Sequence, residues 1–116
     1  MSANTSDVLA HHLDAFSQGN VDETLKDYAD DSILLHPDGV VKGLAELGSF
    51  FTEIYKAFPP GNYSFEMRRQ EVHGEIAYIV WKADTPSLDV PLGTDTFVVR
   101  DGKIVVQTFA GQLIPK

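Results

Sequence analysis

The stretch YADDSILLHPDGVVKG, from Tyr28 to Gly43, separates two kinds of sequence pattern. Apolar residues recur at helical spacing before it, whereas one further helical pattern and then alternating, strand-like patterns follow it. Inside the stretch, the segments Ser32–Leu35 and Val40–Val41 predict two short strands. His36–Gly39 between them is typical of a turn, because proline presets φ and Asp-Gly tolerates positive φ. The sequence therefore predicts a pair of short strands, with one ionisable side chain, His36, where the first strand ends.

The segment before this stretch predicts two helices. In the first, Ser6 is suited to cap the N-terminus and Gly19 to end the helix. The apolar stripe of this helix contains Val8, Leu9, His12, Leu13 and Phe16. A second, short helix is expected from a cap at Asn20 to the acidic pair Asp30–Asp31, with Tyr28 facing inward.

The segment after Gly43 predicts one long helix and four long strands. Phe51 lies on the apolar stripe of the helix, which is expected to end at Pro59–Gly61 because proline cannot continue a helix. The apolar period then changes to two, which predicts strands over residues 62–72, 76–84, 88–100 and 104–114. Pro91–Gly93 interrupts the third of these strands, and this predicts a bulge or a sharp bend.

The segregation of helices and strands predicts an α+β fold. Because the strands exceed the usual ~5–6 residues and their interruptions allow curvature, we expect a cone-shaped, curved antiparallel sheet. This α+β barrel would wrap around the long helix, and the two N-terminal helices would close its pocket. A length of 116 residues suits one domain, which is expected to span residues 6–116 after a disordered segment at residues 1–5.

Composition restricts the partners that the chain is expected to have. The net charge is −8 and the basic residues are scattered, whereas a nucleic-acid surface needs clustered lysine and arginine. No run approaches the ~18 apolar residues of a membrane span. We therefore expect neither nucleic acid nor membrane as a partner. The sequence contains no cysteine and its N-terminus lacks the apolar core of a signal peptide, which together predict a cytoplasmic location.

Several kinds of chemistry have no motif in the sequence. There is no cysteine nucleophile, no Gly-x-Ser-x-Gly elbow and no glycine-rich phosphate loop. His12, His36 and Asp95 would form a known type of metal-ligand set, but no local spacing of ligands supports a metal site. We expect no metal and no cofactor.

Four motifs give the chain a family resemblance. They are FSQGNVD at residues 16–22, YADDS at 28–32, HPDG at 36–39 with Lys42–Gly43, and FVVRDGKIV at 97–105. With these motifs the chain resembles the nuclear transport factor 2-like superfamily, which includes steroid Δ-isomerases, SnoaL-like polyketide cyclases and limonene epoxide hydrolase. The resemblance covers residues 8–113 and implies a cone-shaped fold with an apolar pocket. This shell hosts unrelated chemistries, so the resemblance indicates fold more strongly than function.

Matched position by position, the steroid isomerases imply three catalytic residues. Their general-base aspartate precedes a proline in the strand-pair turn, where this chain has His36. Their protonated aspartic acid, which donates a hydrogen bond to the developing oxyanion, matches Asp95. Their oxyanion tyrosine on the first helix matches His12. In the SnoaL-like cyclases an acid/base aspartate lies on the last strand, and Phe109 occupies the matching position.

Each of these three residues also has a structural interpretation. A neutral imidazole at His36 can accept a proton at neutral pH, but a turn histidine can equally bond a nearby carbonyl. An apolar setting would raise the pKa of Asp95 and favour the neutral acid; on the surface, Asp95 would cap a backbone N–H instead. His12 lies on an apolar helical stripe, where a histidine is often a satisfied core residue.

The pocket is expected to bind a small hydrophobic organic ligand. The residues expected to contact it are Phe16, Tyr28, Leu35, Phe51, Trp81, Phe97, Gln107 and Phe109. Two functions remain open. One is a cofactor-independent isomerase, cyclase or lyase that moves a proton next to a carbonyl, and the other is a non-catalytic module that binds a hydrophobic ligand or a protein. The charge-mixed sheet face that carries Arg68, Arg69 and Lys82 fits a solvated surface, but the related folds often dimerise through it, and the resemblance therefore implies a homodimer.

Overall fold

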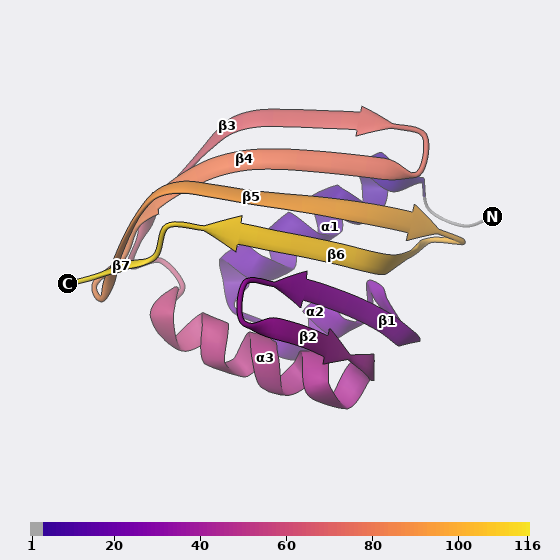
Figure 1. The fold of residues 1–116 in the computed structure, drawn as a ribbon, viewed down its shortest axis with the longest axis horizontal. Helices are drawn as coiled ribbons and strands as arrows, with labels where there is room; N and C mark the ends of the chain where they lie inside the picture. The colour runs from indigo at the N-terminus through magenta and orange to yellow at the C-terminus, as the bar shows by residue number, and fades with distance from the viewer. Residues whose placement is uncertain (1–3) are drawn as a thin grey trace.

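The computed structural model describes residues 4–116 and contains three helices and seven strands (Figure 1). In chain order they are α1 (Thr5–Gln18), α2 (Val21–Leu25), β1 (Tyr28–His36), β2 (Gly39–Lys42), α3 (Gly43–Ala57), β3 (Ser64–His73), β4 (Ile76–Asp84), β5 (Leu88–Arg100), β6 (Lys103–Gly111) and β7 (Ile114–Pro115). The expected α+β class is confirmed. Met1–Ala3, part of the segment expected to be disordered, lie outside the described residues.

The strands form one sheet in the order β2-β1-β6-β5-β4-β3, and β7 pairs with β5. The expectation of a purely antiparallel sheet was wrong at one place, because β1 pairs with β6 in parallel. Every other pair of neighbouring strands is antiparallel. Apolar alternation assigns the faces of a strand but carries no information about the direction of its neighbour, so the sequence could not reveal this mixed pairing.

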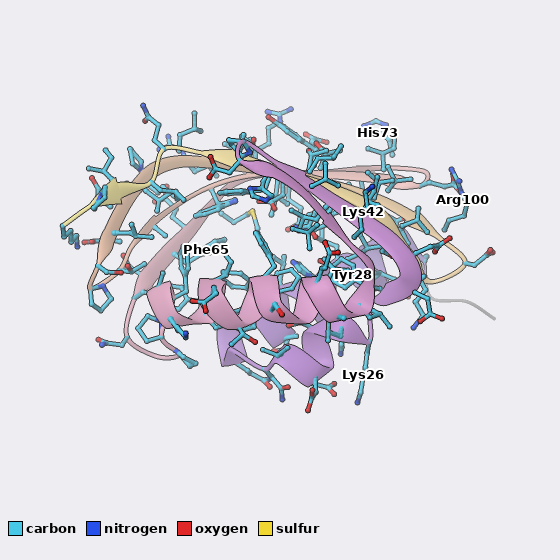
Figure 2. The ribbon with its side chains drawn as sticks, turned by 60° about the horizontal axis from the view of Figure 1, so that its bottom comes forward. Lys26, Tyr28, Lys42, Phe65, His73 and Arg100 are labelled. Atoms are coloured by element: carbon cyan, nitrogen blue, oxygen red, sulfur yellow. The ribbon has the colours of Figure 1, made fainter. Side chains whose placement is uncertain are left out.

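The sheet curves over α1 and α3 (Figure 1), and the view from below shows it arching above α3 (Figure 2). Between β4 and β5 the register shifts where the single residue Lys82 faces Pro91 and Leu92. This shift is the bulge that the interruption at Pro91–Gly93 predicted. A second shift, between β3 and β4 beside Met67, lies in the same part of the sheet. Bulges bend and twist the strands that carry them, which accounts for the arch.

The two N-terminal helices differ from the expectation, because the first begins earlier and the second ends earlier. Helix α1 begins earlier, since the side chain of Asn4, rather than that of Ser6, accepts a hydrogen bond from the backbone N–H of Asp7 at 2.8 Å. Helix α2 ends at Leu25, so Tyr28 opens strand β1 instead of facing inward from a helix. The acidic pair at residues 30 and 31 lies in an irregular part of β1, where the register to β6 shifts.

The core lies between the concave face of the sheet and the helices. Alternate residues of β4, from Ala77 to Ala83, and of β5, from Asp95 to Val99, are buried on this face. Helix α3 buries Leu47, Phe51 and Tyr55. The strands and helices thus meet along apolar faces, as the sequence periods predicted. Over residues 4–116, none of the helices has the length and apolar character needed to cross a membrane.

Candidate active site

A cavity of about 370 Å³ lies between the sheet and helices α1 and α3. This volume falls in the range of small-molecule sites. The lining is almost entirely apolar and consists of His12, Leu13, Phe16, Ser17, Leu34, Phe50, Phe51, Glu53, Ile54, Ala57, Phe58, Tyr63, Phe65, Ile79, Trp81, Leu88, Asp95, Phe97, Gln107, Phe109 and Leu113. Four of these side chains are exposed, and they define the mouth of the cavity: Ser17, Glu53, Phe65 and Leu113. In Figure 2, Phe65 lies toward the end of the arch opposite Tyr28.

Asp95 is the buried carboxyl group of this cavity. It lies on the concave face of β5 and is only 8% exposed. Trp81 Nε1 donates a hydrogen bond to its Oδ1, and Gln107 Nε2 donates one to its Oδ2, each at 2.9 Å. Each donor comes from a neighbouring strand and lies diagonally opposite Asp95, because Trp81 pairs with Gly93 and Gln107 pairs with Phe97. Diagonal neighbours of this kind are within reach of long side chains.

The ionisation of Asp95 is set by two opposing effects. Burial raises the pKa of this carboxyl to about 6, while the hydrogen bonds from Trp81 and Gln107 act to lower it. The upward direction is the one expected for an apolar setting. At neutral pH, however, a group with a pKa of about 6 is mostly ionised. Asp95 is therefore better suited to accept a proton than to donate a hydrogen bond as a neutral acid.

Tyr28 fixes the orientation of the Gln107 side chain. The Tyr28 hydroxyl donates a hydrogen bond to Gln107 Oε1, which leaves Nε2 directed at Asp95. Tyr28 is buried at the start of β1 and does not line the cavity itself. Tyr28 was predicted to contact a ligand directly. In the structure it instead contacts Gln107, which does line the cavity.

His12 reaches the same cavity from helix α1. The side chain is only 4% exposed, and among residues 4–116 its Nδ1 has no hydrogen-bond partner. The ring of Phe97 lies 5.2 Å from it, centroid to centroid. Burial, helped by the neighbouring His11, lowers the pKa of His12 to about 4, so the imidazole is neutral at neutral pH. A buried polar atom without a partner is costly, typically by ~1–3 kcal/mol.

His36 does not join Asp95 and His12. It is half-buried at the end of β1, where its ring packs 5.3 Å from that of Phe50, centroid to centroid. Its Nδ1 accepts a long hydrogen bond of 3.4 Å from the backbone N–H of Asp38. Phe50 lines the cavity and His36 does not. Of the three residues that the steroid isomerases implied, only Asp95 and His12 line the cavity.

Leu35 also lies away from the cavity. It is 39% exposed, whereas its neighbour Leu34 is 1% exposed and lines the cavity. Successive side chains of a strand point to opposite faces, so only one of these two leucines can face inward. The remaining aromatic and amide residues expected to contact a ligand do line the cavity, and these are Phe16, Phe51, Trp81, Phe97, Gln107 and Phe109.

Several lining residues were missed by the sequence interpretation. Phe50 and Ile54 belong to the apolar stripe of α3 beside Phe51, and that stripe could have revealed them. Phe65 packs on Trp81 at 5.5 Å and Phe109 packs on it at 6.2 Å, with ring planes 24° and 20° from parallel. This three-ring stack depends on the register between strands, for which the sequence gives no direct signal.

A second ionisable cluster lies outside the cavity, where α1 meets α2 and β1. His11 Nδ1 lies 2.7 Å from Asp27 Oδ2, and His11 Nε2 lies 3.2 Å from Glu23 Oε1. Hydrogen bonds to Asp27 and then Glu23 raise the pKa of His11 above its usual 6.5. Burial raises the pKa of Asp27 in spite of its bond to His11. This cluster connects helix α1 to helix α2 and to the residue that precedes strand β1.

The cluster predicts a pH-dependent contribution to stability. Because the folded pKa of His11 is raised, its stabilising effect is complete below pH 6.5 and is lost as the pH rises through the folded pKa. His12 and Asp95, with pKa values of about 4 and 6, titrate below this window. The effect should stay below about 1 kcal/mol, since the His11 side chain is 38% exposed. The free energy of unfolding in urea, measured from pH 6.5 to 8.5, should fall as the pH rises. This fall should be smaller in His11→Gln, and an equal slope in both proteins would contradict the role of His11.

Comparison with known proteins agrees with this fold. The sequence model of the SnoaL-like domain matches residues 9–107, and no curated protein sequence matches the chain. A nuclear transport factor 2-like protein from Cytophaga hutchinsonii superposes with a TM-score of 0.79 at 10% identity, covering 97% of this chain and 93% of that one. A proposed ketosteroid isomerase from Kribbella flavida superposes with a TM-score of 0.77 at 18% identity, covering 93% of this chain and 77% of that one. For a proposed polyketide cyclase from Sinorhizobium meliloti the TM-score is 0.74 at 20% identity, over 89% and 93% of the two chains.

The fold defines the class of protein. The curved sheet closed by helices over an apolar cavity is the nuclear transport factor 2-like fold. The chain belongs to the SnoaL-like family within that fold. At identities of 20% or less, the structural neighbours show the fold alone.

Proposed function

We propose that the protein is a cofactor-independent enzyme that moves a proton next to a carbonyl group of an apolar small molecule. Such a reaction would be an isomerisation, a cyclisation or an elimination. One observation carries the proposal: the carboxylate of Asp95 is held by two N–H donors in an apolar cavity that also contains His12. A buried carboxylate with a pKa near the working pH is well matched to the task of a general base.

In this proposal Asp95 takes the proton from the carbon next to the carbonyl. In an isomerisation it returns the proton to another carbon, in an elimination to the departing group, and in a cyclisation to the oxygen of the carbonyl that is attacked. His12 would donate a hydrogen bond from its neutral ring to the oxygen that gains negative charge. This assignment reverses the roles that the steroid isomerases implied, in which His36 is the base and Asp95 the donor. The reversal is supported by the cavity lining, which includes Asp95 and His12 but not His36, and by the pKa of Asp95.

Exchange of hydrogen for deuterium tests this proposal without knowledge of the natural substrate. The protein is incubated in D₂O with apolar ketones such as 2-tetralone, and NMR follows the loss of the hydrogens next to the carbonyl. We expect exchange of at least one ketone to be ~100-fold or more faster than in buffer, the usual scale of general-base catalysis. Exchange at the buffer rate, together with binding of the ketones, would favour a non-catalytic module that binds hydrophobic ligands.

We also propose that two copies of the chain pair through the outer face of the sheet, and that the protein works in the cytoplasm. Support for the pairing comes from rows of neutral residues that cross the strands on that face. Ile76, Val98 and Val106 form one row, and Tyr78, Thr96 and Thr108 form the next. Ile76 and Tyr78 are among the exposed large apolar side chains, and contiguous exposed apolar surface is typical of an interface.

A charge placed on this outer face is expected to separate the copies. Light scattering during gel filtration should give twice the chain mass of 12.8 kDa for the wild-type protein and 12.8 kDa for Tyr78→Lys, because an interface centre does not tolerate an unpaired charge. Ser49→Lys, on the exposed side of α3, serves as the control and should leave the mass unchanged. A monomeric wild-type protein would contradict the pairing.

A further inference from the structure

We propose that the cavity selects apolar organic amines in their protonated form, with the ammonium N–H groups facing the carboxylate of Asp95. This inference goes beyond the proposed function by naming a second class of ligand, which would occupy Asp95 in place of a ketone. It rests on the cavity as the binding site and does not require that a proton be moved. Among residues 4–116, the cavity lining contains no lysine and no arginine. Its two carboxyl side chains are Asp95 inside and Glu53 at the mouth.

Within residues 4–116, the carboxylate of Asp95 has no positively charged partner. Its two hydrogen-bond donors, the indole of Trp81 and the amide of Gln107, are both neutral. Each carboxylate oxygen has two lone pairs, so each can accept one hydrogen bond beyond those of the structure. A buried charge is costly unless it is paired, and a ligand that brings the opposite charge therefore gains more from this cavity than a neutral one.

The surroundings of Asp95 suit an ammonium group in two further ways. Phe97 lies two residues along β5 on the same face, and the aromatic side chains of the lining offer ring faces to a cation. His12 is neutral and so does not repel a cation. The ammonium group of a primary amine carries three N–H donors, enough for both oxygens of Asp95.

The same features oppose an anionic ligand. A carboxylate or phosphate placed in the cavity would meet Asp95 without any basic side chain to offset the repulsion. The net charge of −8 adds a long-range field of the same sign, which lowers the local concentration of anions and raises that of cations. The lining therefore disfavours anionic ligands, and the net negative charge of the whole chain acts in the same direction.

Three probes that share one ring system test this inference by titration calorimetry at neutral pH. They are 2-naphthylmethylamine, 2-naphthylmethanol and 2-naphthoate, which carry charges of +1, 0 and −1. We expect the amine to bind ~10-fold or more tightly than the alcohol, the scale of one charged hydrogen bond, and the naphthoate to bind weakest. Asp95→Asn should remove the advantage of the amine, whereas Asp89→Asn, which is exposed and outside the cavity, should keep it.

The outcomes separate this inference from the proposed function. Equal binding of the three probes by the wild-type protein, or tightest binding of naphthoate, overturns charge selection without any variant having to fold. Loss of the amine preference in Glu53→Gln but not in Asp95→Asn also overturns it, because the selection would then lie at the mouth. Ketone exchange is measured in a separate experiment. Exchange at the buffer rate would contradict the proposed enzyme without affecting charge selection, and equal binding of the three probes would contradict charge selection without affecting the proposed enzyme.

Discussion

Replacing Asp95 with asparagine is expected to lower the rate of ketone exchange by ~100-fold or more, the usual scale for the loss of a general base. Asparagine has nearly the shape of aspartate but cannot take up a proton at neutral pH. It also fits the hydrogen bonds poorly, because Trp81 and Gln107 both present N–H groups to the side chain. One of these donors would therefore face the NH₂ group of the new amide. Initial rates of exchange for the two proteins, followed by NMR, measure the effect.

The same substitution distinguishes two roles for Asp95. If Asp95 were the neutral hydrogen-bond donor that the steroid isomerases implied, asparagine would keep a donor and the rate should fall only slightly. The pH profile provides a second readout. As a base with a pKa of about 6, Asp95 must be ionised, so the rate should be lost as the pH falls through about 6 and should level off above it. A rate that rises toward low pH would contradict the role of base.

Asp89→Asn is the matched control for this experiment. Asp89 lies on the same strand, β5, but is exposed and does not line the cavity. The exchange rate of this variant should equal that of the wild-type protein. Fluorescence of Trp81, which is the only tryptophan of the chain and contacts Asp95, can show that the cavity of Asp95→Asn is still formed.

The sequence was sufficient to predict which side chains share one face of a strand, but not which face of the last two strands turns inward. Alternation placed Ile79 with Trp81, and Asp95 with Phe97, on shared faces that the structure shows to be buried, and the interruption at Pro91–Gly93 correctly predicted a bulge. These features depend on local periodicity and on the backbone preferences of proline and glycine, and both can be read from a single segment of the chain.

The arrangement of the site depended on information that a single segment does not contain. The hydrogen bonds of Asp95 come from β4 and β6, so they depend on the register of two strand pairs. The position of His36 depends on Phe50, which comes from a different element and packs against the imidazole ring at the edge of the cavity. A resemblance at the turn supplied the position of His36 in the sequence but could not supply this packing.

Replacing Gly93 with alanine is expected to destabilise the fold and to displace Trp81. A Cβ atom at residue 93 would lie 2.4 Å from Cε2 and 2.5 Å from Cζ2 of the Trp81 indole. The indole has little freedom to withdraw, because Phe65 and Phe109 are stacked on it. Overpacking of a core typically costs ~1–3 kcal/mol, and loss of the Trp81 bond to the charged Asp95 would add ~1.5–3 kcal/mol.

Thermal unfolding and tryptophan fluorescence together measure this effect. A cost of each kcal/mol lowers the Tm of a domain of this size by ~4–8 °C, so the fall for Gly93→Ala should be large, and a shifted emission maximum of Trp81 should accompany it. Gly48→Ala is the matched control, because its Cβ would meet only Leu25 Cδ1 at 3.4 Å, an ordinary contact. Gly48 lies inside helix α3, where alanine is favoured over glycine by ~1 kcal/mol. The two glycine substitutions should therefore shift the Tm in opposite directions, and an unchanged Tm and emission spectrum in Gly93→Ala would show that Trp81 can move without cost.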